Sequence, residues 1–181
     1  MDLKFSGQKM LVASVTARSE MHGQDREPAS DVGLEANLSN DVLNIFHPGL
    51  KGLLYYFDPA KERDLADQGK STEAGFMPDL RFPKLLLPLK WDEEIAEARV
   101  TISVPGTKTE VVLEPAKVNK FALTPLEGGT LSFGMRVQYK PDEKQAGKLA
   151  MLVQQEVEVR LEPIPPKQEQ IPAETPPASA P

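Results

Sequence analysis

The chain has 181 residues with a net charge of −6 at neutral pH, 40% hydrophobic residues and 27% charged residues, as in an ordinary soluble protein. This acidic balance excludes the overall basic surface that duplex-DNA-binding proteins use, although it leaves room for a local basic groove. The chain has no cysteine, which excludes disulfides, zinc fingers and cysteine hydrolases. No apolar run approaches the roughly 18 residues that cross a bilayer, so we expect no membrane association.

The first half of the chain predicts two strands followed by a short helical region. Residues 9–18 are apolar on both faces and indicate a strand, and we interpret residues 19–30 as a polar loop. Residues 31–39 alternate strictly between apolar and polar, which predicts a second strand with one buried face. From Ser39 or Asn40, either of which can be the N-cap, the period becomes helical, and Pro48 separates two short helices or a helix and a turn.

The second half of the chain predicts most of the sheet. Residues 58–78 are polar and indicate a long surface loop or insertion. Proline residues punctuate the extended segment that follows, so any strand there belongs at a sheet edge. Turn signals and period-two alternation then indicate a series of strands. The predicted strands are residues 97–104, 109–115, 116–126, 130–139 and 156–163, with a short helix or bulged strand between 141 and 154.

These elements predict a mainly β protein, an antiparallel β-sandwich or distorted barrel of about seven strands with one or two short helices. We expect one domain over residues 1–162. Residues 163–181 hold seven of the seventeen prolines and are expected to form a disordered, polyproline-like tail.

The stretch SEMHGQDREPASD, residues 19–31, concentrates acidic side chains around one of the two histidines. His22, Asp25, Glu27 and Asp31 are candidate metal or acid–base groups, but their spacing does not match a calcium-binding loop, and no second cluster completes a ligand set. We therefore favour a solvated loop and keep His22, Asp25 and Asp31 as weak metal candidates.

Catalytic motifs are missing from the sequence. It contains no G-x-S-x-G nucleophile elbow and no phosphate-binding loop, and nothing nearby supports His22 or His47 as the base of a serine triad. We expect a protein that is not an enzyme and that needs no cofactor.

The stretch LLYYF, residues 53–57, is the clearest candidate binding feature. Its tyrosines either straddle a helix with their hydroxyls in water, anchor a protein interface, or stack on single-stranded bases near basic side chains. The candidate binding residues are Tyr55, Tyr56, Lys51, Arg63, Arg81 and Lys84, and a groove that also includes Lys70 would support single-stranded DNA binding.

Several fragments carry a resemblance to a known family: SNDVLNIFHPGLKGLLY, LRFPKL, EGGTLSFGMRVQ and AGKLAMLVQQEVEVRL. Together with EMHG and EPASD, these fragments resemble a family of uncharacterised proteins of tailed bacteriophages and prophages. The resemblance covers most of residues 9–161 and carries no catalytic signature. It implies a phage gene expressed in the host bacterial cytoplasm, often near early genes for DNA metabolism or recombination.

We therefore expect a phage-encoded, non-enzymatic accessory protein that acts by binding, most of all to a host or phage protein. One alternative is a single-stranded DNA-binding accessory protein of phage replication or recombination. The other is a structural component of the virion, which should form a defined oligomer.

Overall fold

The computed structural model describes residues 3–22, 25–61, 75–85 and 88–165 of the chain. Of the residues singled out above, Arg63 and Lys70 lie outside this part, as do most of the predicted 58–78 loop and the proline-rich segment from residue 166 onward. The side chains of His22 and Asp25 also lie outside the described part.

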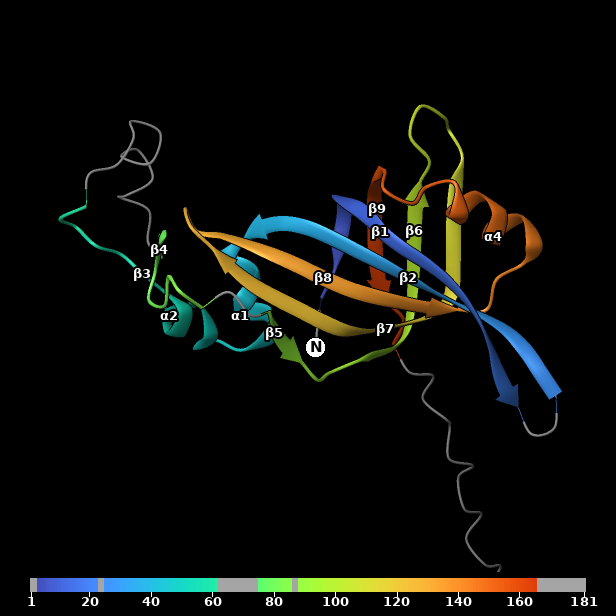
Figure 1. The fold of residues 1–181 in the computed structure, drawn as a ribbon, viewed down its shortest axis with the longest axis horizontal. Coiled ribbons are helices and arrows are strands. Elements are labelled where there is room, and N and C mark those ends of the chain that lie inside the picture. Colours follow the sequence, from blue (N-terminus) through green and yellow to red (C-terminus); the bar gives the residue numbers. More distant parts are fainter. Residues whose placement is uncertain (1–2, 23–24, 62–74, 86–87, 166–181) are drawn as a thin grey trace, which may run out of the picture.

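An antiparallel sheet of seven strands dominates the structure, and six of these strands close into a barrel (Figure 1). Around the barrel the order is β7, β6, β9, β1, β2 and β8, and β8 pairs again with β7. The fold is therefore the distorted barrel, one of the two mainly β architectures predicted from the sequence. The barrel strands are β1 (Phe5–His22), β2 (Asp25–Ser39), β6 (Ile95–Ser103), β7 (Glu110–Leu126), β8 (Thr130–Tyr139) and β9 (Glu156–Pro163).

The long strand β7 closes the barrel because its two halves have different partners. Its first half pairs with β6 and its second half with β8, and Ala116 and Val118 pair on both sides. The short strand β5 (Leu89–Trp91) pairs with β7 next to Phe121. Two predicted strands, 109–115 and 116–126, are thus one continuous strand that changes neighbours.

The barrel interior follows from the period-two alternation of the sequence. In β8 every second residue from Leu131 to Tyr139 is buried, and in β9 Val157, Val159 and Leu161 are buried in the same way. The predicted turn between β7 and β8 is also confirmed, with Gly128 and Gly129 at φ angles of +73° and +71°, which favour glycine.

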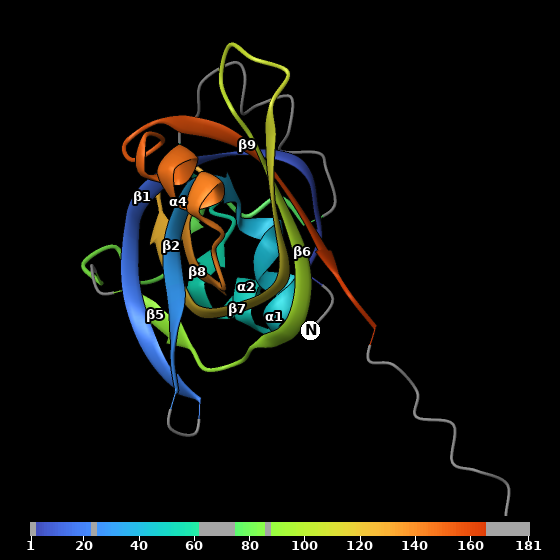
Figure 2. The same cartoon turned by 90° about the vertical axis from the view of Figure 1, so that its right-hand side faces the viewer.

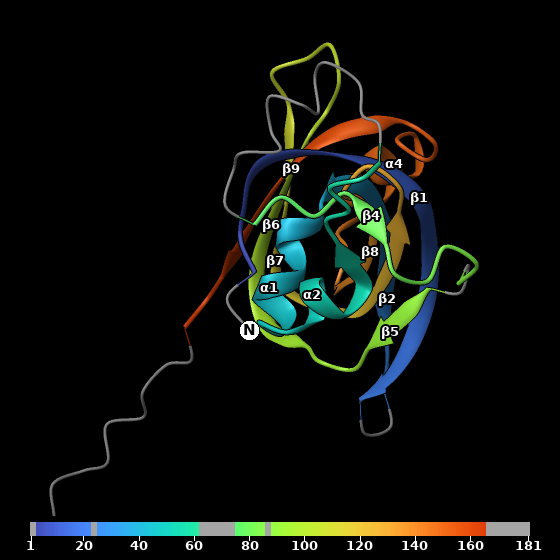
Figure 3. The ribbon, with the colours of Figure 1, turned by 90° about the vertical axis from the view of Figure 1, so that its left-hand side faces the viewer.

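Short helices fill one end of the barrel (Figure 3). Ser39 caps the first of them, because its Oγ accepts from the backbone N–H of Asp41 at 3.2 Å. Phe46 points into the barrel and contacts the rings of Trp91, Phe121 and Phe133. The helices are η1 (Asn40–Val42), α1 (Leu43–Phe46) and α2 (Leu50–Leu54), and a small sheet of β3 (Tyr55–Tyr56) and β4 (Asp79–Leu80) follows them. We call this the plug end.

Helix α4 (Glu143–Ala150) lies at the opposite end of the barrel (Figure 2). A capping box starts the helix: the side chain of Asp142 accepts from the backbone of Gln145, and the Gln145 side chain accepts from the Asp142 backbone. Leu149 is fully buried and fixes the helix on the barrel. Among the described residues, no helix is long and apolar enough to span a membrane.

The interpretation of residues 19–30 as a loop is wrong. Strands β1 and β2 continue as a paired hairpin, with Ser19 opposite Pro28 and Met21 opposite Arg26. This hairpin extends beyond the rest of the barrel (Figure 1). Residues 19–30 do not alternate between apolar and polar, so the period-two pattern that predicts a strand is absent here.

Candidate functional site

Tyr55 is a structural residue and not a surface aromatic. Its side chain is fully buried, and its hydroxyl donates to the carbonyl oxygen of Thr130 and accepts from the backbone N–H of Leu126 at 3.1 Å. These bonds tie the plug to the turn between β7 and β8. Burial raises the pKa of Tyr55, and the hydrogen bond from Leu126 opposes that rise. Of the alternatives considered for the tyrosines, base stacking and an interface contact are therefore wrong for Tyr55.

Tyr56 lies on the other side of β3 and is partly exposed, because successive residues of a strand face opposite ways. The guanidinium carbon of Arg81 lies 5.5 Å from the centroid of the Tyr56 ring, a cation–π contact. Arg81 is fixed further by two bonds to the end of α2: its backbone N–H donates to Leu54 at 2.9 Å, and its Nε donates to the Gly52 carbonyl at 2.8 Å. The structure thus brings together two of the predicted binding residues.

Residues 81–85, the stretch RFPKL, form a mainly apolar, shallow hollow of about 570 Å³ beside this pair. Phe82 is 52% exposed and Leu85 is 36% exposed, although both are large apolar side chains. The backbone N–H of Leu85 donates to the Phe82 carbonyl at 2.9 Å, so a turn sets the spacing of the two side chains. Lys84, another predicted residue, lies exposed in the same turn.

We call this surface the aromatic–basic patch. Its members share solvent exposure and a position at the plug end: Leu53, Tyr56, Arg81, Phe82, Lys84 and Leu85. Leu53, 58% exposed, stands on the last turn of α2 between the two residues whose carbonyls hold Arg81. The sequence analysis missed Leu53, Phe82 and Leu85, although a phenylalanine between an arginine and a Pro-Lys pair was the available signal.

Lys51 does not belong to the patch. It is 7% exposed, and its ammonium donates to the carboxylate of Asp41 and, at 2.6 Å, to the carbonyl of Gly75. The hydrogen bond from Lys51 is the largest of the effects that lower the pKa of Asp41. The prediction that Lys51 contacts a ligand is wrong, because its charge is already neutralised within the fold.

A polar cavity of about 610 Å³ adjoins Lys51. Asn40 lines it, and its side-chain amide donates to the carbonyl of Met77 at 2.7 Å. The polar groups of Lys51, Asp41 and Asn40 all bond to other groups of the chain, so they hold this region together.

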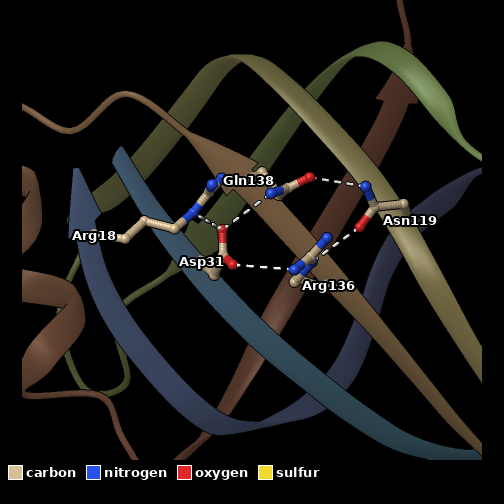
Figure 4. Close-up of polar contacts among 5 residues, drawn as sticks. All are labelled: Arg18, Asp31, Asn119, Arg136 and Gln138. Atoms are coloured by element: carbon tan, nitrogen blue, oxygen red, sulfur yellow. Dashed lines mark hydrogen bonds and ion pairs between the residues drawn. The ribbon is translucent and has the colours of Figure 1, made fainter. Parts of the chain in front are cut away.

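Asp31 is the centre of a polar network on the outer face of the barrel (Figure 4). Its carboxylate accepts from Arg18 Nε at 2.9 Å, from Arg136 Nη1 at 3.2 Å and from Gln138 Nε2 at 3.3 Å. Asn119 completes a ring, because it accepts from Arg136 at 3.0 Å and donates to Gln138 at 2.8 Å. The network joins the four neighbouring strands β1, β2, β8 and β7.

This arrangement corrects the interpretation of Asp31 as a weak metal ligand. Two arginines occupy its carboxylate, and their positive charge disfavours a cation at the same place. The described residues contain no group of three or more acidic or histidine side chains that could hold a metal ion.

Comparisons with known proteins identified no relative of this chain. No family model matched the chain, and searches of curated proteins and of solved structures found no significant match.

Proposed function

We propose that this protein is a phage-encoded, non-enzymatic accessory protein that binds a host or phage protein through the aromatic–basic patch. The bacterial cytoplasm is the proposed place of action, as the resemblance to phage and prophage proteins implies. One observation carries the binding role: large apolar side chains and two cations are gathered, exposed, on a turn that the rest of the fold holds in place.

The apolar part of the patch favours a protein partner. Phe82 and Leu85 flank a hollow that would accept an apolar side chain, and Leu53 extends the surface toward α2. The residues that contribute most of the binding free energy at a protein interface are often aromatic residues and arginine, and they lie near its centre. The patch contains aromatic residues and an arginine, and none of them belongs to the buried core.

The charges define the partner further. Arg81 and Lys84 are two exposed cations that lie beside the apolar side chains of the patch. They would attract carboxylates that flank the apolar side chain inserted in the hollow. We therefore expect a partner segment in which one or two large apolar residues are next to aspartate or glutamate.

Single-stranded DNA binding is the second candidate, and the ring of Phe82 beside Arg81 and Lys84 favours it. Two of the predicted DNA contacts are lost, however, because Tyr55 is buried and Lys51 is paired with Asp41. The remaining described site offers one exposed ring, one partly exposed ring and two cations, which is little for a strand that carries one phosphate per nucleotide.

Site-specific photo-crosslinking in the bacterial host tests the proposed function. A photoreactive phenylalanine analogue would replace Phe82, and a matched protein would carry it at Met151, which is 77% exposed at the other end of the barrel. We expect a discrete crosslinked protein from position 82 only. Leu85→Asp should reduce that product at least fivefold, because it places a carboxylate in the apolar hollow.

The crosslinked partner would then be purified and titrated against the wild-type protein and Leu85→Asp. Equal products from positions 82 and 151, or a product that Leu85→Asp leaves unchanged, would refute binding through the patch. Crosslinks from position 82 to nucleic acid instead of protein would move the second candidate to first place.

A further inference from the structure

The hairpin of β1 and β2 continues beyond the strands that flank it. On one side β9 pairs with β1 only as far as Leu11, and backbone bonds from Gln154 and Gln155 reach Val12. On the other side β8 pairs with β2 only from Ser30 onward. In the described part of the chain, residues 14–22 of β1 therefore pair only with β2, and residues 25–29 of β2 pair only with β1. We call these residues the arm.

The two edges of the arm differ. The edge of β2 carries Pro28, which has no N–H to offer, and Lys140 forms an ion pair with Glu27 beside it. Proline and charged side chains are the usual protection of a sheet edge against pairing with another strand. One edge of the arm is thus closed to strand addition.

The edge of β1 carries charged residues, Arg18 and Glu20, but lacks the other protection. Residues 14–22 contain no proline and no lysine, and Ser14, Thr16, Ala17, Ser19 and Met21 are exposed. Every second N–H and C=O of such a strand points away from its partner and is a donor or acceptor for another strand. An edge of this length without a proline can accept an added strand whose charges complement its own.

We propose that this edge pairs antiparallel with the same edge of a second copy of the chain, about a twofold axis that passes through residue 19. In an antiparallel pair about such an axis, each residue lies opposite its symmetry counterpart, and side chains on one face of the strand meet side chains on the same face. The sequence of the strand can therefore be examined for registers in which it complements itself.

The charges select the register. An axis through residue 18 places arginine opposite arginine, and an axis through residue 20 places glutamate opposite glutamate. An axis through residue 19 places position 18 of each strand opposite position 20 of the other, and the sequence has arginine at the first and glutamate at the second. Arg18 also donates its Nε to Asp31 of its own chain at 2.9 Å. Opposite charges directly across a strand pair stabilise it and like charges destabilise it. Serine, small and uncharged, then meets serine on the axis.

The arm is at the far end of the barrel from the plug (Figure 1). Pairing through the arms would leave the plug ends of both barrels uncovered, so a dimer would present two copies of any surface located there. A contact through one pair of strand edges is small, so we expect a dimer that dissociates on dilution.

Sedimentation velocity over a range of protein concentrations tests this proposal. The wild-type protein should approach about twice its 19.9 kDa as the concentration rises. Ser19→Lys and Ser19→Glu should each raise the dimer dissociation constant roughly tenfold or more, because each places like charges opposite one another on the axis. An equimolar mixture of the two variants should recover the dimer, since only residue 19 faces its own counterpart.

Ser6→Glu is the matched control, because Ser6 is also an exposed serine of β1 but pairs with Arg160 of β9 within the chain. It should leave dimerisation unchanged, and circular dichroism should show the same fold for all variants. A wild-type protein that stays monomeric at every concentration would overturn the proposal. So would a dimer that Ser19→Lys does not weaken, or variants that do not recover when mixed.

Discussion

The two ends of the barrel are built in different ways. At the plug end, buried rings fill the opening: Phe46 contacts three aromatic side chains, and Tyr55 bonds to both strands of the adjoining turn. At the other end, β1 and β2 leave the barrel as an arm, and Asp31 joins its base to β8 through Arg136 and Gln138. Packing holds the first end, whereas polar contacts between strands hold the base of the arm.

Because the two ends are stabilised differently, they expose different groups for binding. The plug end can display side chains on a rigid support, because its own stability comes from residues behind the surface. The arm instead displays backbone, because one of its edges has no strand partner among the described residues. The following predictions test the comparison, beginning with the largest expected effect.

Phe46→Ala should lower the free energy of unfolding by about 3–5 kcal/mol, the usual range for removing a buried phenylalanine. The side chain is 8% exposed and is the centre of the aromatic contacts of the plug. Chemical denaturation monitored by tryptophan fluorescence would measure the change. Phe82→Ala, which removes a ring that is 52% exposed, should change stability by less than about 0.5 kcal/mol. Similar losses for both variants would show that Phe46 does not close the barrel.

Tyr55→Phe should cost about 1–3 kcal/mol, because it leaves the Leu126 N–H and the Thr130 carbonyl without their buried partner. It should also change the response to alkali. Since burial raises the pKa of Tyr55 above its usual 10.0, the folded state holds a proton that the unfolded state releases, and stability falls as the pH rises above 10.

Denaturation at pH 8 and at pH 10.5 would measure both effects. The alkaline loss should be smaller in Tyr55→Phe than in the wild type. It should not vanish, because burial also raises the pKa of Tyr139. An equal alkaline loss in both proteins would contradict the role assigned to the Tyr55 hydroxyl.

Asp31→Ala should destabilise the protein by about 1 kcal/mol or more, since it removes three hydrogen bonds at a partly buried network. Hydrogen exchange should report the change most strongly in the arm, at the amides around Ala17. Glu94→Gln is the control, because Glu94 forms an exposed ion pair with Lys117, and it should leave exchange in the arm unchanged. Uniform acceleration over the whole barrel would show that the network does not act on the arm.

Asp41→Asn should lower the free energy of unfolding at neutral pH, and this difference from the wild type should disappear in acid. Hydrogen bonds from Lys51 and Ser39 lower the pKa of Asp41 below its usual 3.8, so the stability from this carboxylate is present above that pH and is lost as the pH falls through the lowered value. The unfolding free energy should therefore depend less on pH between 4 and 2 in the variant. An unchanged acid dependence would show that the pair contributes nothing.

The sequence predicted the parts of the barrel in which one face is buried. Residues 130–139 alternate without exception, and the structure buries the same five side chains that the pattern selects. The sequence predicted the N-cap at Ser39 or Asn40, where the structure has Ser39, and the helix break at Pro48, because single residues determine these features. The sequence did not distinguish a closed barrel from a sandwich, because closure depends on β7 exchanging one neighbour for another at Ala116 and Val118.

The candidate site was predicted only in part, for physical reasons. Tyr55 and Tyr56 are adjacent, and the change from α2 to β3 between Leu54 and Tyr55 decides which of them is buried. Lys51 carries a charge that suggests solvent, but Asp41, ten residues earlier, provides the partner that allows its burial. Such pairings join distant positions, and no local pattern reveals them.

Size-exclusion chromatography with light scattering, with and without a fluorescent single-stranded oligonucleotide at low salt, tests most directly whether the patch serves protein or DNA. The account predicts that the oligonucleotide elutes apart from the protein, because the described site has few rings and few cations. Co-elution that is lost in high salt, and lost in Phe82→Ala and Arg81→Ala, would contradict it and identify the protein as a single-stranded DNA-binding accessory.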